Sequence, residues 1–169
     1  MKKWGLAALF FILLSVPALS QERGSQIFQG KIGAGFNMHN VTQHKKNMPV
    51  LAVKYWISEI VGIEGFAGFD VGNNESFYVI GGKLLGIIQS YKNFNIFTSA
   101  TMALDFVNPK QSKSYAGVSF LAGAGAEWFI LNNISLATEV GLKLSSGNST
   151  TSVKTYADVI PNLSIKFYL

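Results

Sequence analysis

The sequence predicts an all-β fold, an eight-stranded antiparallel up-and-down transmembrane β-barrel that follows an N-terminal signal peptide. Three observations predict it: about eight segments alternate in character, their charges fall on one face, and the connections between them alternate in length. Because successive residues of a strand point to opposite faces, such segments form a sheet with one apolar and one charged face. A closed barrel with its apolar face toward lipid and its polar face inside satisfies all three observations.

The leader has the parts of a cleavable secretory signal. Lys2 and Lys3 give it a positive start, and the apolar run that follows, residues 4–14, is shorter than the roughly 20 residues of a spanning helix. Small residues at 18 and 20 suit a cleavage site. We therefore divide the chain into a signal peptide over residues 1–20 and one barrel domain over residues 21–169.

Composition narrows the class of protein. The charged fraction of 14% lies below the roughly 25% of soluble domains, and the sequence has no cysteine with which to form a disulfide framework. Without Lys2 and Lys3, 12 basic and 9 acidic residues leave a net charge of +3. This charge is too small to indicate nucleic-acid binding. We expect no nucleic-acid partner and no cofactor.

The predicted strands cover residues 27–38, 49–57, 60–71, 76–88, 94–106, 114–130, 134–145 and 156–168. Each is long enough for the roughly 9 to 11 residues of a tilted membrane strand. Their charged residues share one parity, which we assign to the inside of the barrel. In chain order these are Lys31 in the first strand, Lys54 in the second, Glu64 and Asp70 in the third, Lys83 in the fourth, Asp105 in the fifth, Glu127 in the sixth, Glu139 and Lys143 in the seventh, and Asp158 and Lys166 in the eighth.

Alternation is clearest in the fifth to seventh strands. In the seventh, even positions from Ile134 to Leu144 are apolar or threonine, and odd positions from Ser135 to Ser145 are small or charged. The fifth and sixth strands repeat this pattern, so that Phe120 is expected to face lipid and Glu127 the lumen.

Connection lengths orient the barrel. The connections after the second, fourth and sixth strands are short and cover residues 58–59, 89–93 and 131–133. Those after the first, fifth and seventh are longer and polar and cover residues 39–48, 107–113 and 146–155, whereas the connection at 72–75 is short and is the exception. Short periplasmic turns with longer outside loops are typical of the bacterial outer membrane, and an even strand number returns both termini to the periplasm.

Aromatic residues near the strand ends are expected to form girdles at the two membrane interfaces. They are Phe28, Tyr55, Tyr78, Phe94, Phe106, Trp128 and Phe167. Trp56 has the inward parity near a periplasmic turn, which predicts a bulge or a plug. Pro161 would delete a ladder hydrogen bond and predicts a bulge or a strand start.

The whole mature chain resembles the small eight-stranded outer-membrane barrels of the OmpA, OmpX and opacity-protein type. Its last strand carries apolar residues at alternate positions, like the C-terminal assembly signal of those proteins, with Leu169 in place of their usual final aromatic residue. The alternating residues are Leu163, Ile165, Phe167 and Leu169. The resemblance implies an outer-membrane location, lipids and the barrel assembly machinery as partners, and a monomer.

An eight-stranded barrel is only wide enough for side chains to fill it, and a lone buried charge is strongly unfavourable. We therefore predict an ion-pair network in the lumen, formed by Lys31, Lys54, Glu64, Lys83, Glu127, Glu139, Lys143 and Lys166. A gated ion path or proton relay is the alternative interpretation, although nothing in the sequence identifies a gate.

The sequence gives little support for an enzyme. The barrel lipid A deacylases use a His–Ser pair on a strand, but His39 and His44 are expected in the first outside loop, and no serine lies two residues from either. Two loop histidines beside Lys45 and Lys46 are expected to be solvated, and metal binding by the pair is the alternative. We expect no catalytic and no metal site.

Lysines dominate the predicted outside loops. We single out Lys45, Lys46, Lys110 and Lys113. They form either a solvated rim or a set of contacts to phosphates of lipopolysaccharide, whose dense negative charge attracts such a rim.

Together these features predict a non-enzymatic outer-membrane barrel with a filled polar lumen that serves envelope structure or surface interaction through its outside loops. A narrow porin-like channel for ions or small hydrophobic ligands is the first alternative. A soluble periplasmic lipocalin-like carrier, with the apolar face inside, is the second.

Overall fold

The computed structural model describes residues 29–41, 46–110, 113–147, 150–156 and 162–169. The predicted signal peptide lies outside these residues, as do Phe28, Asp158 and Pro161. The described part of the chain contains no helix long and apolar enough to cross a membrane. It consists of strands and the turns that join them.

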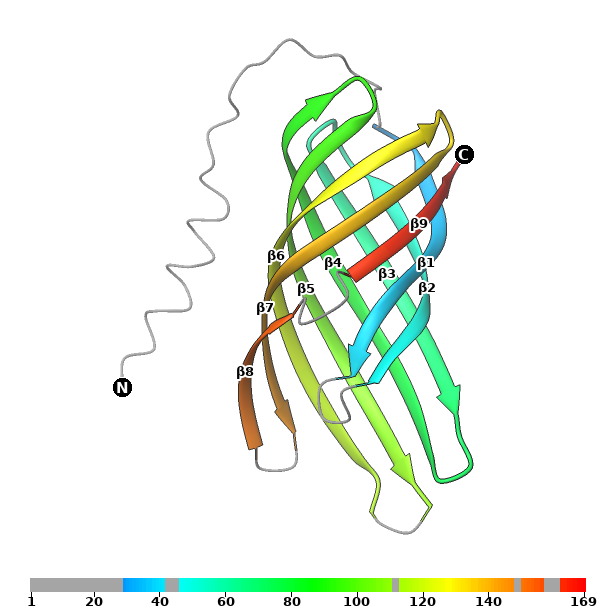
Figure 1. Ribbon diagram of the computed structural model, residues 1–169, viewed down its shortest axis with the longest axis vertical. Coiled ribbons are helices and arrows are strands. Elements are labelled where there is room, and N and C mark those ends of the chain that lie inside the picture. The colour runs from blue at the N-terminus through cyan, green and yellow to red at the C-terminus, as the bar shows by residue number, and fades with distance from the viewer. Residues whose placement is uncertain (1–28, 42–45, 111–112, 148–149, 157–161) are drawn as a thin grey trace, which may run out of the picture.

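The strands form a single antiparallel barrel wall whose members are all tilted in the same sense (Figure 1). They are β1 (Ile32–Val41), β2 (Lys46–Trp56), β3 (Val61–Val71), β4 (Glu75–Tyr91), β5 (Phe94–Pro109), β6 (Tyr115–Leu131), β7 (Ile134–Gly147), β8 (Thr150–Tyr156) and β9 (Asn162–Tyr168). Each strand from β1 to β7 pairs with the next, and β9 pairs with both β7 and β1. The barrel is therefore closed.

The eighth position of the wall is occupied by two short strands. β8 pairs with the C-terminal part of β7, from Gly141 to Gly147, and β9 pairs with the N-terminal part, from Ile134 to Glu139. Counted by position in the wall, the closed barrel has eight strands, and the predicted fold class is confirmed. The predicted strand at 156–168 was wrong at its start, because β8 ends at Tyr156 and β9 begins at Asn162.

Two outside connections are shorter than the predicted loops. β1 runs to Val41 and β2 begins at Lys46, with the ladder continuing through the pairs His39↔Met48 and Asn40↔Asn47. β7 extends to Gly147 and β8 begins at Thr150, so most of the predicted loop at 146–155 is a strand hairpin. The polar composition of both segments predicted loops. In β8, however, Thr150, Thr151, Val153 and Thr155 are β-branched and favour a strand, and outside the membrane a strand needs no apolar face.

Figure 1 places the β1–β2, β3–β4, β5–β6 and β7–β8 hairpins at the lower part of the barrel, and the C-terminus and the start of β1 at its upper end. We call these the outer end and the periplasmic end. Near the periplasmic end, the ladder is shifted between Ile87 and Gln89 of β4 and between Phe129 and Leu131 of β6. Each of these bulges adds a further isoleucine, Ile88 or Ile130, to the exposed surface.

The outward face of the barrel is apolar. Residues such as Leu51, Val53 and Ile80 expose 62%, 55% and 55% of their surface, whereas the inward neighbours Ala52 and Lys54 are buried. This arrangement is the opposite of that in a soluble carrier, in which apolar side chains fill the interior. The lipocalin-like alternative is therefore wrong.

Aromatic residues mark both ends of this apolar face. Near the periplasmic end, Phe94 pairs with Trp128. Near the outer end, Tyr78 pairs with Phe106 on one side and with Phe69 on the other. Phe94 and Phe106 lie 12 positions apart in β5, or about 40 Å along the strand at ~3.4 Å per residue. At a tilt of about 40° this spans about 30 Å, close to the thickness of a bilayer core.

Candidate functional site

The candidate site is the interior of the barrel. Three lysines and three glutamates project into it and are buried or nearly so: Lys54, Lys83, Lys166, Glu64, Glu127 and Glu139. They come from six different strands, and each occupies an inward position of its strand. Equal numbers of the two signs make this group of six electrically neutral.

Glu127 of β6 accepts hydrogen bonds from several donors. Lys54 Nζ of β2 reaches across the lumen and lies 3.0 and 3.1 Å from its two carboxylate oxygens. The hydroxyls of Ser135 and Tyr168 each donate to Glu127 Oε1 at 2.7 Å. Lys54 Nζ also lies 5.4 Å from the centre of the Trp56 ring, within cation–π range. A carboxylate with no exposed surface is thus fully supplied with donors, as burial of a charge requires.

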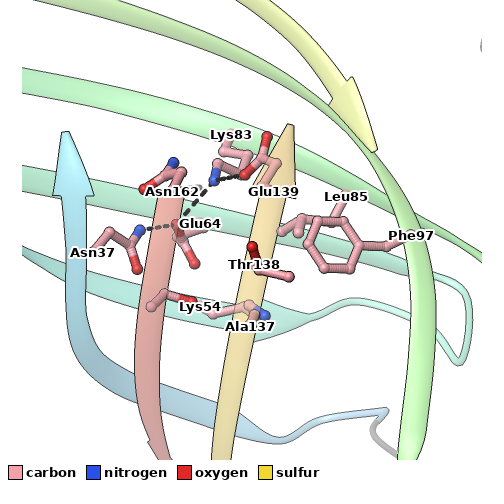
Figure 2. A pocket seen from close by; sticks show the side chains of 11 residues that line it. Asn37, Lys54, Glu64, Lys83, Leu85, Phe97, Ala137, Thr138, Glu139 and Asn162 are labelled. Atoms are coloured by element: carbon pink, nitrogen blue, oxygen red, sulfur yellow. Dashed lines mark hydrogen bonds and ion pairs between the residues drawn. The ribbon is translucent and has the colours of Figure 1, made fainter. Parts of the chain in front are cut away.

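A second group of contacts links the other four charges in a chain of alternating sign. Lys83 Nζ lies 2.6 Å from Glu139 Oε2 and 3.9 Å from Glu64 Oε1, and Lys166 Nζ lies 3.1 Å from Glu64 Oε2. The Asn37 amide donates to Glu64 Oε1 at 2.6 Å and its oxygen accepts from Lys166. Figure 2 shows Asn37, Glu64, Lys83 and Glu139 converging in this way.

The structure also places the other two members of the predicted network, Lys143 and Lys31. Lys143 is buried in β7, farther toward the outer end than Glu139, and Lys31 is half-buried just before β1. Ser99 of β5 donates a hydrogen bond to Glu139, a partner that sequence reasoning missed because serine on an inward position is common and unspecific.

His39 is not in an outside loop, and that prediction was wrong. It is buried in β1, where its Nε2 lies 3.1 Å from Asp105 Oδ1 of β5 and its ring centre lies 5.6 Å from that of Phe66. β1 simply continues past Asn37, and His39 keeps the inward parity of that residue. His44 lies outside the described residues. Among the described residues no cluster of three or more His, Cys, Asp or Glu side chains could hold a metal ion.

Apolar side chains fill the lumen on both sides of the charges. Toward the periplasm the cluster consists of Trp56, Leu85, Phe97, Phe129, Ala137 and Tyr168, contributed by six strands. Glycines make room for it, because a Cβ at Gly33 would lie 2.7 Å from the Tyr168 ring and one at Gly62 would lie 2.8 Å from the Trp56 ring. Of the two predictions for Trp56, the plug is correct. Toward the outer end the cluster consists of Met48, Val50, Ala52, Phe66, Phe77, Val79, Ala103 and Val107.

Two small cavities lie between these side chains. They adjoin each other beside the charges and measure about 10 and 20 Å³, and each is close to the size of one water molecule. Neither of these two cavities is large enough to form a continuous path through the barrel.

The structure describes only part of the predicted lysine rim. Lys110 and Lys113 are exposed at the tip of the β5–β6 hairpin, and the Lys110 amide donates to the Asn74 carbonyl of the neighbouring hairpin at 2.9 Å. Lys46 begins β2, but its side chain is not described, and Lys45 lies outside the described residues.

No protein-family model and no curated protein sequence matches the chain. Among solved structures, the N-terminal β-barrel domain of Pseudomonas aeruginosa OprF is similar, with a TM-score of 0.61 and 12% identity over 85% of this chain and 100% of that chain. Ail, the attachment invasion locus protein of Yersinia pestis, has a TM-score of 0.46 and 13% identity over 83% of this chain and 99% of its own. Neisserial surface protein A has a TM-score of 0.44 and 10% identity over 81% and 94%. At 12% identity, the similarity to OprF establishes the fold.

Proposed function

Because the chain has the fold of the small eight-stranded outer-membrane barrels, we propose that it is a non-enzymatic protein of the bacterial outer membrane, exported by a cleaved signal peptide. Its role is structural support of the envelope or surface interaction through the outside loops. The barrel itself serves as a rigid, closed support. Loops on such a scaffold commonly carry the specific activity.

The observation that carries this proposal is the filled lumen. The six buried charges neutralise one another, and the cluster around Trp56 and Tyr168 lies between them and the periplasm. An ion would have to break a buried pair and then displace aromatic rings to pass. These costs favour a closed barrel over the narrow porin-like channel, which is the alternative function.

Planar-bilayer recording tests this proposal. We expect the purified wild-type barrel to give no steady conductance. Trp56→Ala together with Tyr168→Ala should raise the conductance, because the two substitutions remove two large rings of the periplasmic cluster. Tyr55→Ala and Tyr78→Ala are the matched control, because both rings face outward. Steady, ion-selective conductance by the wild type would overturn the closed-barrel function in favour of the channel.

For the outside loops we propose contacts between lysines and the phosphates of lipopolysaccharide. The support is the exposure of Lys110 and Lys113 at a hairpin tip and the strong field of a phosphate-rich surface. Lys45 and Lys46 complete the proposed set.

Vesicles with and without lipopolysaccharide test this contact. Replacing Lys45, Lys46, Lys110 and Lys113 with Gln should weaken binding to lipopolysaccharide-containing vesicles and reduce its dependence on salt. Lys92→Gln is the control, because Lys92 is exposed at a periplasmic turn. Unchanged binding after the four substitutions would contradict the phosphate contacts and favour a solvated rim of lysines.

A further inference from the structure

The two lumen cavities adjoin each other between the ion pairs and the outer half of the barrel. Both are lined by Asn37, Lys83, Glu139 and Asn162. The larger one also reaches His39 and Thr101, among others. The larger cavity therefore lies between the Lys83–Glu139 pair and His39, whose ring contacts Asp105.

Two polar atoms in these walls are buried without a hydrogen-bond partner among the described residues: Thr101 Oγ1 and Asn162 Oδ1. Thr101 as a whole is only 6% exposed. Buried polar atoms in folded proteins are nearly always hydrogen-bonded to protein or to ordered water, because burial of an unmet donor or acceptor is unfavourable. Unmet atoms beside a cavity therefore indicate an occupant of that cavity.

The size and chemistry of the cavities identify the occupant. A cavity needs about 10 to 15 Å³ to hold one water molecule, and these measure about 10 and 20 Å³. A water molecule in the larger cavity can donate to Asn162 Oδ1 and can donate to or accept from the Thr101 hydroxyl. A bare cation is disfavoured because the Lys83 ammonium lies in both walls and already neutralises Glu139 at 2.6 Å.

We propose that these cavities are water-binding sites, and that water in the larger one joins His39 to the ion pairs of the lumen. The water is bound and does not form a column through the barrel, because the cluster around Trp56 separates it from the periplasm. The proposal concerns the interior alone and does not depend on what the outside loops bind.

The substitution Thr101→Val distinguishes a hydrated cavity from a dry one by the sign of its effect. Valine has nearly the shape of threonine and replaces the hydroxyl with a methyl group. If water is bound, the variant loses a hydrogen bond to it, and we expect a lower urea midpoint of unfolding in detergent micelles. If the cavity is dry, the variant removes an unmet polar atom, and a higher midpoint would overturn the proposal. Thr101→Ser, which keeps the hydroxyl, should retain more of the wild-type midpoint than valine does.

Ser119 provides a matched control. Its hydroxyl is also buried without a partner among the described residues, but Ser119 lines neither cavity. Ser119→Ala should therefore leave the midpoint unchanged or raise it. An equal fall for Ser119→Ala and Thr101→Val would show that the threonine effect is not specific to the cavity, and would contradict the proposal.

Solution NMR detects the occupant directly. We expect cross-relaxation between water and the backbone amide of Thr101 in the wild type, and a reduced signal in Thr101→Val. Replacing sodium chloride with choline chloride at equal ionic strength should leave the midpoint of unfolding unchanged. A sodium-dependent midpoint that disappears in Thr101→Val would identify a bound cation and overturn the assignment to water.

Discussion

Glu139 shows how strongly a single lumen residue depends on its partners, since it pairs with Lys83 Nζ at 2.6 Å. Glu139→Leu should destabilise the folded barrel by about 3 to 5 kcal/mol, because it leaves a buried ammonium without its main partner. Urea unfolding in micelles measures this loss. The double variant with Lys83→Met should recover part of the stability, because removal of both partners leaves no uncompensated charge. A double variant that is less stable than Glu139→Leu would argue against the pairing.

Tyr168 allows a test of a single hydrogen bond to Glu127. Tyr168→Phe keeps the ring, whose centre lies 5.6 Å from that of Phe129, and removes only the hydroxyl that donates to Glu127. Hydrogen bonds to charged groups contribute about 1.5 to 3 kcal/mol, so we expect a loss of that size in the free energy of unfolding. Tyr55→Phe, on the exposed face, should change it by less than about 0.5 kcal/mol. Equal effects of the two substitutions would exclude a special role for the Tyr168 hydroxyl.

Sequence parity predicted which residues enter the lumen far better than it could predict their partners. Lys54 and Glu127 pair although they belong to β2 and β6, which are not neighbours in the wall. Which side chains meet across a barrel depends on the stagger of all its strands, a quantity that no single segment encodes. His39 was missed for a different reason, because the end of β1 was placed too early.

At the scale of the strand, β7 tests which face meets lipid. Leu142 is 50% exposed and its neighbour Lys143 is buried, so Leu142→Arg should cost about 2 to 4 kcal/mol if it lies near the midplane of the bilayer. Refolding into lipid vesicles at graded urea concentrations measures this cost. Ser146→Arg, exposed near the outer end of the same strand, should cost about 0 to 1 kcal/mol. Tolerance of arginine at 140, 142 and 144 alike would reverse the faces of β7.

The strand ends and irregularities were the least predictable parts of the elements. In β5 and β7, successive residues alternate strictly between the outward and the inward face, and this fixes the face of every residue within the membrane. The predicted faces of these two strands were therefore correct. The outer ends of β1 and β8 lie beyond the apolar belt of the barrel and have no apolar face. Their polar composition alone therefore predicted loops. The bulges at Ile88 and Ile130 were also missed. An extra apolar residue in a strand looks like an ordinary strand residue in the sequence, and only its pairing with the neighbouring strand shows the bulge.

For the whole molecule, closure of the wall predicts resistance to denaturation. A closed barrel exposes no free edge from which pairing can be lost progressively. We expect the folded chain in detergent to migrate differently on gels before and after boiling, with a urea-unfolded sample matching the boiled one. Migration unchanged by boiling, combined with full solubility in buffer without detergent, would contradict a membrane barrel.

The fold of the whole molecule followed from the sequence more securely than any detail. Eight alternating segments, a single charged face and two classes of connection all require the same closed architecture, and an error of a few residues at one strand end leaves that architecture unchanged. The division of the eighth wall position between β8 and β9 could not be predicted in this way, because it arises from pairing with β7 rather than from the alternation of the segment.

The position of Lys166 in the last strand has a consequence for assembly. Before β9 docks, the other five charges of the group, Lys54, Lys83, Glu64, Glu127 and Glu139, sum to −1. Docking of β9 brings Lys166 to Glu64 and the Tyr168 hydroxyl to Glu127, and closes the wall against β1. The same seven residues thus complete the wall and balance the charge of this group of six.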